Sequence, residues 1–466
     1  MIALAATAAC MLFVAHLFRQ EIKSNPASSR ALWVPFLWMF LAGSRLASSW
    51  LDLSPPQDSM DTYQEGSPID RAVFFLLIIG GVAILLRRKL AWGRLIACNK
   101  LLLLYFAYCL ISILWSDAPF VAFKRWFKDM GNPIMVLVIL TTPDATKALT
   151  QTLRRLSFLF LPLSVLFVKY YPSLGRAYKI QGDPMYTGIG HQKNDLGLMC
   201  LVAGVYFLWQ LIQDRDHFLT WSRGRRICIY LLSGMLAWLL YMSDSQTSLT
   251  CLVIAAAAML ATQLPYVRRQ PERLVGLLVV SGLSYFVLDE VFDLKTEVLH
   301  LLGRNPTLTN RTELWDILFR IDTDPIFGAG FMSFWVGERM ERIWNAVGVS
   351  VNQAHSGYIE QFLNLGYVGV SFMVLLLLKA LLDARRQLRS NQLMATLRVT
   401  FVLAAILYNY TEASFYGISN MWILTLVALI HLPEAPSEAP DETTRRSGPG
   451  KRGELMAPAH SSFHRA

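Results

Sequence analysis

The stretch QFLNLGYVGVSFMVLLLLKALLDARRQLR, residues 361–389, decides the class of this fold. Its apolar part, residues 361–382, is long enough as a helix to cross a hydrocarbon core of about 30 Å, which takes roughly 20 residues. The block ends in a basic cluster of Arg385, Arg386 and Arg389. Because such clusters stay on the cytoplasmic side of a membrane, the stretch predicts both a transmembrane helix and its direction.

Similar apolar blocks recur along all 466 residues, and hydrophobic residues make up 54% of the chain against 16% charged residues. This composition is typical of a protein embedded in hydrocarbon rather than dissolved in water. We therefore expect an all-α polytopic integral membrane protein, a bundle of about 12–13 transmembrane helices. The candidate spans are residues 2–18, 31–49, 71–86, 95–115, 129–142, 153–170, 194–212, 227–243, 247–264, 273–292, 361–382, 396–411 and 417–432.

Basic residues cluster in alternate loops between these spans, as expected for cytoplasmic loops. The clusters are Arg19/Lys23/Arg30, Arg87/Arg88/Lys89, Arg154/Arg155, Arg223/Arg225/Arg226, Arg268/Arg269 and Arg385/Arg386/Arg389. The alternation predicts that the N-terminus lies on the outer side of the membrane and the C-terminus on the cytoplasmic side. It also accounts for the net charge of +10 without nucleic acid as a partner. Residues 1–432 should form the helical bundle, and the Pro-, Glu-, Ser- and Arg-rich residues 433–466 a disordered cytoplasmic tail.

The longest polar interval, residues 293–360, falls on the outer side in this topology and is too long for a simple connector. Asn310 and Glu313 form a helix-start pattern, and apolar residues then repeat at helical spacing. A second helix is predicted over residues 331–344. A further amphipathic pattern predicts that residues 119–128 form a helix lying in the membrane interface.

Basic residues in predicted outer loops break the charge rule and are therefore candidates for function. The first group precedes the seventh span, where glycines allow close approach of a ligand to the backbone. Its basic side chains could converge on an anion at the outer surface. The alternative is that they contact lipid phosphates. The candidate substrate-binding residues here are Arg176, Lys179, His191, Lys193 and Asn194.

Arg311 is the second candidate, because it stands in the first turn of a predicted helix, where free backbone N–H groups already favour an anion. An arginine at this position can bind a phosphate with two parallel hydrogen bonds. The alternative is an ion pair with Glu313 or with a loop acid. Arg304 is also an arginine in the predicted outer interval, although it is not at the start of a predicted helix. We include it as a candidate substrate-binding residue.

His355 is the third candidate, at the outer mouth of the eleventh span. A neutral imidazole can accept a proton from a hydroxyl group, and Glu360 could orient the ring. A lone histidine is often only an interfacial polar residue, but this one accompanies Arg311 and Lys193 on the predicted outer side. The turn over residues 243–248, with Ser245 and Gln246, should form a further wall of the same cavity, unless it is only a hairpin turn.

The order of these segments resembles the superfamily of O-antigen ligases and polysaccharide polymerases, especially its exopolysaccharide-production polymerase branch. The resemblance covers residues 188–369. It rests on GHQKNDLG at residues 190–197, SDSQTS at 243–248, NRTELW at 310–315, PIFGAGF at 325–331, AHSGY at 354–358 and LGYVG at 365–369. Gln246 stands where many relatives have arginine, and Ser356 where asparagine is common.

The resemblance implies an inverting, metal-independent glycosyl transfer from a polyprenyl-diphosphate-linked oligosaccharide to a hydroxyl group of an acceptor glycan. It places the protein in the bacterial inner membrane, in contact with membrane lipids and with other polysaccharide assembly and export proteins, and it implies no cofactor. His355, Arg311 and Glu360 would then be catalytic. Arg311 and Lys193, supported by Arg176, would stabilise the leaving diphosphate. The motifs do not separate polymerase from ligase, and we favour the polymerase.

Two other classes of function remain open. A transporter or flippase for a lipid-linked or anionic solute would also place basic residues in a membrane cavity. It would bury charged residues in mid-span, where Arg45 is nearly the sole strongly basic candidate, and would show paired broken helices, which the sequence does not suggest. A non-catalytic assembly scaffold would not need Arg311 together with His355.

Overall fold

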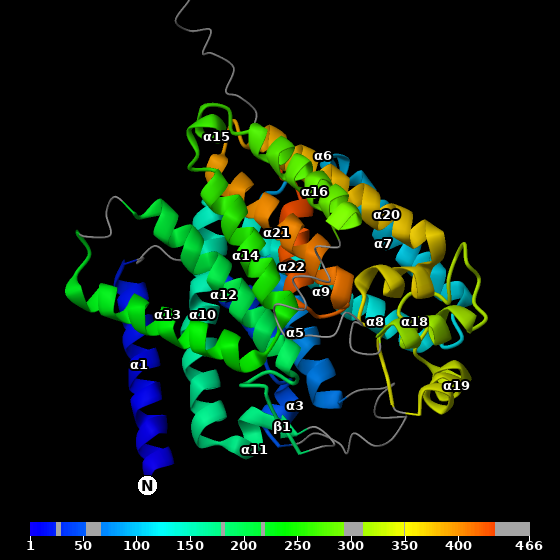
Figure 1. Ribbon diagram of the computed structural model, residues 1–466, viewed down its shortest axis with the longest axis horizontal. Coiled ribbons are helices and arrows are strands. Elements are labelled where there is room, and N and C mark those ends of the chain that lie inside the picture. The colour runs from blue at the N-terminus through cyan, green and yellow to red at the C-terminus, as the bar shows by residue number, and fades with distance from the viewer. Residues whose placement is uncertain are drawn as a thin grey trace, which may run out of the picture. The chain divides into compact units, whose positions relative to one another are not determined.

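The computed structural model describes residues 1–24, 29–52, 67–178, 182–215, 220–292, 311–348 and 350–433. These residues form helices almost throughout, with one short two-stranded sheet, which confirms the predicted all-α polytopic membrane class (Figure 1). Residues 1–432 make one compact unit. Most of the predicted tail and the first part of the long polar interval, residues 293–310, lie outside the described residues.

The helices before the sheet belong to the first half of the predicted spans. Their bounds are α1 Ile2–Ser24, η1 Arg30–Leu32, α2 Trp33–Gly43, α3 Ala47–Trp50, α5 Pro68–Leu86, α6 Trp92–Cys98, α7 Lys100–Ile111, η2 Ser112–Trp115, α8 Pro119–Asp129, α9 Gly131–Leu140, α10 Ala145–Tyr170 and α11 Pro172–Gly175. The sheet pairs β1, Arg176–Tyr178, antiparallel with β2, Pro184–Tyr186.

The remaining helices carry most of the candidate site. They are α12 Lys193–Gln213, α13 Arg223–Ser243, α14 Gln246–Ala261, α15 Pro265–Arg269, α16 Arg273–Phe292, α18 Arg311–Arg320, α19 Gly337–Val347, α20 Gly357–Gln387, α21 Gln392–Thr411 and α22 Asn420–Leu429. Every predicted span coincides with one or more helices along the chain.

Seven helices in the described part of the chain are long and apolar enough to cross a membrane, and α6 with α7 makes an eighth span if the pair is counted despite its 85° bend. Several of the other predicted spans are shorter apolar helices, among them α14 and α22. The predicted number of about 12–13 spans is therefore larger than the number of long helices and stays a prediction.

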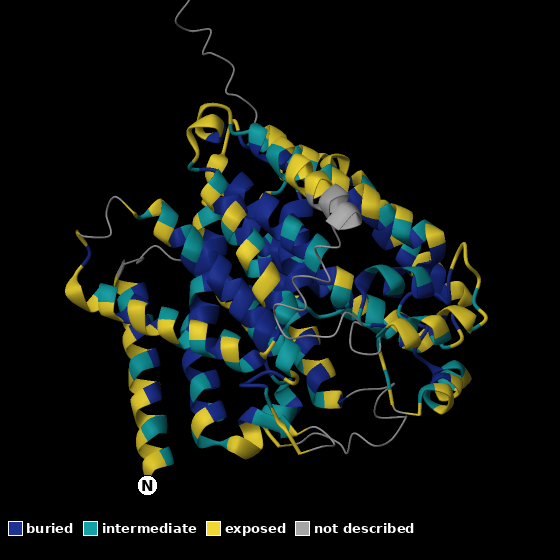
Figure 2. Ribbon diagram, in the orientation of Figure 1, coloured by how far each residue is buried: buried dark blue, intermediate teal, exposed yellow. Residues whose placement is uncertain are grey.

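The helices that carry the site form the centre of the bundle, where α12 packs on α14 and α14 packs on α21. Buried residues make up 72% of the apolar stretch of α12 and also of α21, but only 11% of that of α1 (Figure 2). Apolar residues face outward along α1 because lipid, rather than protein, is the expected surrounding. The central helices are covered by protein and give polar residues at their ends a fixed position.

The described part of the long polar interval begins with the predicted helix at Arg311, now α18, and the predicted interfacial helix over residues 119–128 is confirmed as a helix by α8. The second helix was predicted too early, because α19 begins at Gly337 and not at Phe331. The backbone N–H groups of Phe331 and Phe334 donate instead to side chains of other segments, which holds this stretch in turns.

The glycine-containing motifs at residues 325–331 and 365–369 pack closely against each other in the first turns of α20. Gly366 has a positive φ of 62° with an extended ψ of −164°, a conformation that is essentially restricted to glycine. The backbone N–H groups of Tyr367 and Val368 donate to the carbonyl oxygens of Pro325 and Ile326 at 2.9 and 3.2 Å. A Cβ atom on Gly366 would lie 2.1 Å from the carbonyl oxygen of Ile326, so the close approach requires glycine.

Candidate functional site

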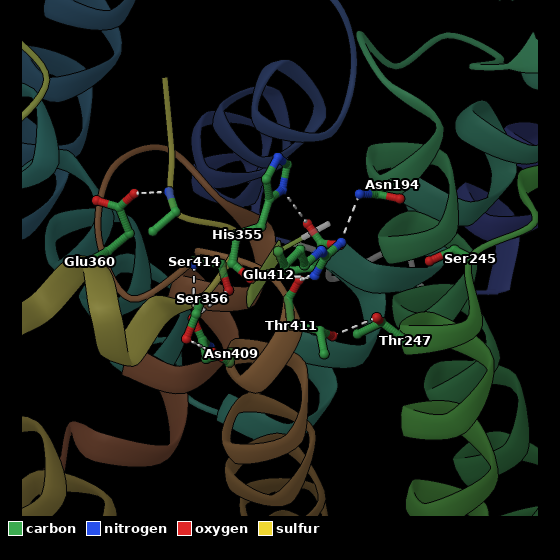
Figure 3. A network of polar contacts seen from close by, with 12 residues as sticks. Asn194, Ser245, Thr247, His355, Ser356, Glu360, Asn409, Thr411, Glu412 and Ser414 are labelled. Atoms are coloured by element: carbon green, nitrogen blue, oxygen red, sulfur yellow. Dashed lines mark hydrogen bonds and ion pairs between the residues drawn. The ribbon is translucent and has the colours of Figure 1, made fainter. Parts of the chain in front are cut away.

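The carboxylate of Glu412, the residue that follows α21, is the centre of a polar cluster built from distant segments (Figure 3). Its Oε1 accepts a hydrogen bond from Nδ2 of Asn194 at 2.8 Å and forms an ion pair with Nη2 of Arg311 at 3.1 Å. Its Oε2 lies 3.7 Å from Nδ1 of His355. The starts of α12 and α18 and the segment before α20 therefore meet at one carboxylate.

His355 is held in a backbone conformation that disfavours a side chain, with a φ of +51°. Hydrogen bonds on either side hold this backbone, because Glu360 accepts the N–H of Ala354 and the carbonyl oxygen of Glu412 accepts the N–H of Gly357, two residues after His355. The side chain is 31% exposed, while its Nδ1 atom is buried and has no hydrogen-bond partner among the described residues. This nitrogen faces Glu412 at a distance slightly longer than a hydrogen bond.

Glu360, which the sequence assigned to orient the ring of His355, acts on the backbone instead. Its carboxylate is fully buried and accepts Nε1 of Trp335 at 3.0 Å, Nδ2 of Asn364 at 3.2 Å and the hydroxyl of Tyr416, in addition to the N–H of Ala354. A buried carboxylate is costly without hydrogen-bond donors, so Glu360 and the groups that donate to it hold one another in place. It therefore positions the segment that carries His355, and the acid beside the ring is Glu412.

Arg311 ties three segments together from the first turn of α18. Its guanidinium pairs with Glu412, and not with Glu313, and it also donates to the backbone carbonyl oxygens of Thr411 and His355. Its side chain is 18% exposed. Much of its donor capacity is used within the protein, so Arg311 holds Glu412 and the His355 backbone in place at the same time as it supplies positive charge.

Lys193 contributes the more accessible positive charge. Its Nζ lies 3.8 Å from Oδ2 of Asp244, and the two side chains are 33% and 58% exposed. Asp244 forms the turn between α13 and α14 with a positive φ of 46°. The predicted wall over residues 243–248 thus contacts the Lys193 segment directly, since a Cβ atom on Gly197 would also lie 2.5 Å from Cβ of Ser245.

The same turn reaches the loop after α21. The hydroxyl groups of Thr247 and Thr411 are 2.6 Å apart, next to Glu412 along the chain (Figure 3). Ser245 is buried and caps α14 by accepting the N–H of Ser248, and Gln246 is partly buried at the first position of that helix.

Two further predicted residues lie in the segment before α12. Nε and Nη2 of Arg176 donate to the carbonyl oxygen of Val168 at 3.0 and 2.9 Å, and the guanidinium lies over the ring of Tyr186. Crowding by protein atoms and the positive charge of Arg45 lower the pKa of His191, which favours a neutral imidazole at pH 7. The other two candidates, Lys179 and Arg304, lie outside the described residues.

Sequence reasoning missed Glu412. A signal was present, because Glu412 is the sole charged residue between the last two predicted spans, on the side that the charge rule makes external. Among the residues that the structure describes, no three His, Cys, Asp or Glu side chains are grouped to bind a metal ion. Arg311 and Lys193 each have a carboxylate partner, so the cluster is closer to neutral than the predicted cationic pocket.

The fold and the site define a polytopic α-helical membrane protein in which four segments distant along the chain, those of Asn194, Arg311, His355 and Glu412, meet at the ends of the central helices. Comparison with known proteins adds a distant relative. The chain is 23% identical over 311 residues to Exopolysaccharide production protein ExoQ of Rhizobium meliloti (strain 1021), which covers 65% of this chain and 68% of that protein. No protein-family model matches the chain.

Proposed function

We propose that this protein is a membrane glycosyltransferase that takes part in exopolysaccharide production. It transfers a glycan from a polyprenyl-diphosphate donor to a hydroxyl group of an acceptor glycan, at the periplasmic face of the bacterial inner membrane, without a metal ion. We favour a polymerase over a ligase because the relative is an exopolysaccharide production protein. The observation that carries the proposal is the meeting of His355, Arg311 and Asn194 at the carboxylate of Glu412.

The proposed reaction is a single displacement at the anomeric carbon of the donor. The acceptor oxygen forms a bond to this carbon while the bond from the carbon to the phosphate oxygen breaks, and the electron pair leaves with the diphosphate. One displacement inverts the configuration. Nε2 of His355 takes the proton of the attacking hydroxyl group, which raises the nucleophilicity of its oxygen.

Glu412 stabilises the charge that His355 acquires in this step. Its Oε2 faces Nδ1 of the ring at 3.7 Å, so the imidazolium formed by proton uptake gains a carboxylate partner as soon as the gap closes slightly. A buried acid that orients a catalytic histidine and stabilises its cation is the arrangement used by many hydrolases. Glu360 serves as a positioning residue for the backbone at Ala354.

The departing diphosphate needs positive charge and hydrogen-bond donors. Lys193 supplies the charge, because its partly exposed pair with Asp244 contributes at most about 1 kcal/mol and a phosphate can displace it. Asn194, Arg176 and a neutral His191 supply donors, and Arg311 adds a second charge. Lys179 and Arg304, together with Ser245 and Gln246, remain proposed substrate contacts.

Alanine replacements test the proposal. His355→Ala should lower the polymer yield of the producing cell by about 10²-fold or more, the usual contribution of a general base. Arg311→Ala should lower it by about as much, because the leaving diphosphate loses a positive charge and Glu412 loses its partner. His16→Ala is the matched control, because His16 lies on α1 and contacts Gln20 of the same helix. Polymer yield and length are compared at equal amounts of protein in the membrane. If both variants are stably inserted and make normal polymer, the catalytic assignment is wrong.

A transporter is the second candidate, and two observations favour it. Arg155 and Glu21 form an ion pair at 3.2 Å that is almost fully buried between α10 and α1, and the pair α6–α7 is a bent apolar segment. The two functions are distinguished in cells that lack the protein, by the face of the membrane at which the lipid-linked intermediate accumulates. A lipid-linked oligosaccharide at the periplasmic face supports the transferase, and one retained at the cytoplasmic face supports the transporter.

A further inference from the structure

A cavity of about 550 Å³ lies beside the first turns of α20, and none of the residues that line it belongs to the cluster around Glu412. Its walls combine two aromatic residues, Trp115 and Phe327, with two acids, Asp322 and Asp324, and with Arg339. We propose that this cavity binds uncharged sugar residues of the acceptor glycan. The inference rests on the proposed function and adds an acceptor subsite to it.

Hydrogen bonds connect the cavity wall to the backbone that carries His355. The N–H of Ala329, in the wall, donates to the carbonyl oxygen of Leu363 in α20 at 3.0 Å. The next residue, Asn364, donates to the carboxylate of Glu360 one turn earlier in the helix, and this carboxylate also accepts the N–H of Ala354. Both sites are therefore built on the first turns of the same helix, and a ligand in the cavity is held in a fixed relation to His355.

The aromatic residues give the cavity a surface suited to sugar rings. Trp115 and Phe327 are 38% and 46% exposed, and their ring centroids are 5.9 Å apart at an angle of 64°. Because the two rings are inclined to each other, a ligand between them can contact the face of each ring. The C–H groups on one side of a pyranose ring pack against such faces and leave the hydroxyl groups free at the rim for hydrogen bonds.

The charges of the cavity select against the diphosphate. Arg339 is neutralised by Asp117, whose Oδ2 lies 2.8 Å from its Nη2. Neither Asp322 nor Asp324 forms an ion pair with another described residue, so the remaining charge is negative. Carboxylates repel a phosphate but accept hydrogen bonds from sugar hydroxyl groups. The cavity is thus complementary to uncharged sugars and unsuited to the phosphate end of the donor.

The turn that begins at Asp324 is closed by its own hydrogen bonds. Oδ1 of Asp324 accepts the N–H groups of Ile326 and Phe327 at 2.7 and 3.0 Å, and the N–H of Gly328 donates to the carbonyl oxygen of Asp324 at 2.8 Å. This turn fixes Phe327 and the carboxylate of Asp324 before a ligand arrives. A site formed in advance costs little ordering entropy on binding.

The test uses the full-length protein in lipid vesicles. The donor is lipid-linked oligosaccharide extracted from cells that lack the protein, and the acceptor consists of oligosaccharide fragments released from the cell's own polymer. Trp115→Ala and Asp322→Ala should raise KM for the fragments about tenfold, leaving kcat and the KM for the donor within about twofold. Trp115→Phe should restore most of the affinity. Phe319→Ala and Asp316→Ala on α18 are the matched controls and should leave kcat and both KM values unchanged.

The results separate failure of the subsite from failure of the proposed function. An unchanged KM for the fragments in both cavity variants overturns the subsite, and so does a raised KM for the donor instead of the acceptor. If the wild-type protein transfers nothing, the proposed function fails, and binding is then measured by fragment-induced change in tryptophan fluorescence. About tenfold weaker binding to Asp322→Ala than to Asp316→Ala would still support the cavity as a saccharide site, and equal binding would overturn it.

Discussion

The carboxylate of Glu412 links three candidate residues because it has two oxygen atoms at the edge of a buried cluster. One oxygen is shared by Asn194 and Arg311, and the other faces His355. Its side chain is only 8% exposed, so water competes weakly for these contacts. The charge on Glu412 is therefore the property of this site that a single substitution tests best.

Glu412→Gln removes that charge and keeps the size of the side chain. Activity should fall about 10²-fold because the imidazolium of His355 loses its partner. Unfolding free energy should fall by about 1–3 kcal/mol because the hydrogen bond to Arg311 loses its ionic character. Polymer yield and the thermal unfolding of detergent-solubilised protein are the measurements. Glu338→Gln on the exposed face of α19 is the control, and equal yields for the two variants would exclude a role for the charge.

Substitutions of Lys193 and Asp244 should have opposite effects on polymer yield, although the two residues form one ion pair. Lys193→Ala should lower polymer yield at least about tenfold because the diphosphate loses a positive charge. Asp244→Asn should leave the yield unchanged or raise it, since asparagine tolerates the positive φ of this residue and the competing carboxylate is gone. Neither should change stability by more than about 1 kcal/mol. An equal loss of yield in both variants would mean that the pair is structural.

At the scale of elements, the start of α20 supports both the proposed catalytic residue and the proposed acceptor cavity. The helix begins after His355, and its kink at Gly366 receives the loop over residues 325–328. Gly328 is equally constrained, with a φ of +70° and its Cβ position 2.5 Å from the backbone of Asn364. Two glycines thus allow two backbones to pack without intervening side chains.

Gly366→Ala should therefore destabilise the protein by more than about 2 kcal/mol, because alanine disfavours this backbone conformation and its Cβ atom would collide with the carbonyl oxygen of Ile326. The amount of protein in the membrane and its thermal unfolding midpoint are measured. Gly93→Ala in α6 is the control, since no atom lies within 4 Å of its Cβ position. A wild-type amount of protein and a wild-type unfolding midpoint for Gly366→Ala would contradict the close packing of Gly366 against Ile326.

At the scale of the whole molecule, the predicted topology places the site and the cavity on the periplasmic side. In a variant without native cysteines, Glu338→Cys should react with a membrane-impermeant maleimide in intact spheroplasts. Arg386→Cys, near the C-terminal end of α20, should react only after the membrane is permeabilised, because it belongs to a basic cluster that the charge rule predicts to be cytoplasmic. Both side chains are well exposed, at 89% and 80%, so access to the reagent depends on the side of the membrane. The reverse pattern of labelling would invert the topology and contradict the proposed location.

The sequence predicted the site in part. Arg311, His355 and Asn194 do meet, and the turn over residues 243–248 does border them. Glu412, and not Glu360, is the acid that lies beside the ring of His355, because closeness along the chain does not place a side chain beside its neighbour. The start of α19 was missed because the turns before it are held by side chains of distant residues, Ser112 and Asn364.

By itself, the sequence determined the helical membrane class. Long apolar blocks and basic clusters act segment by segment, so each can be read without knowing its neighbours in space. Only the tertiary structure decided which charges pair with which, that Glu412 contacts the starts of α12 and α18 and the segment before α20, and that Trp115 and Asp322 line the same cavity. The contacts of Glu412 with Asn194 and Arg311 join residues separated by 218 and 101 positions, and a carboxylate can pair with any cation that the fold brings within reach.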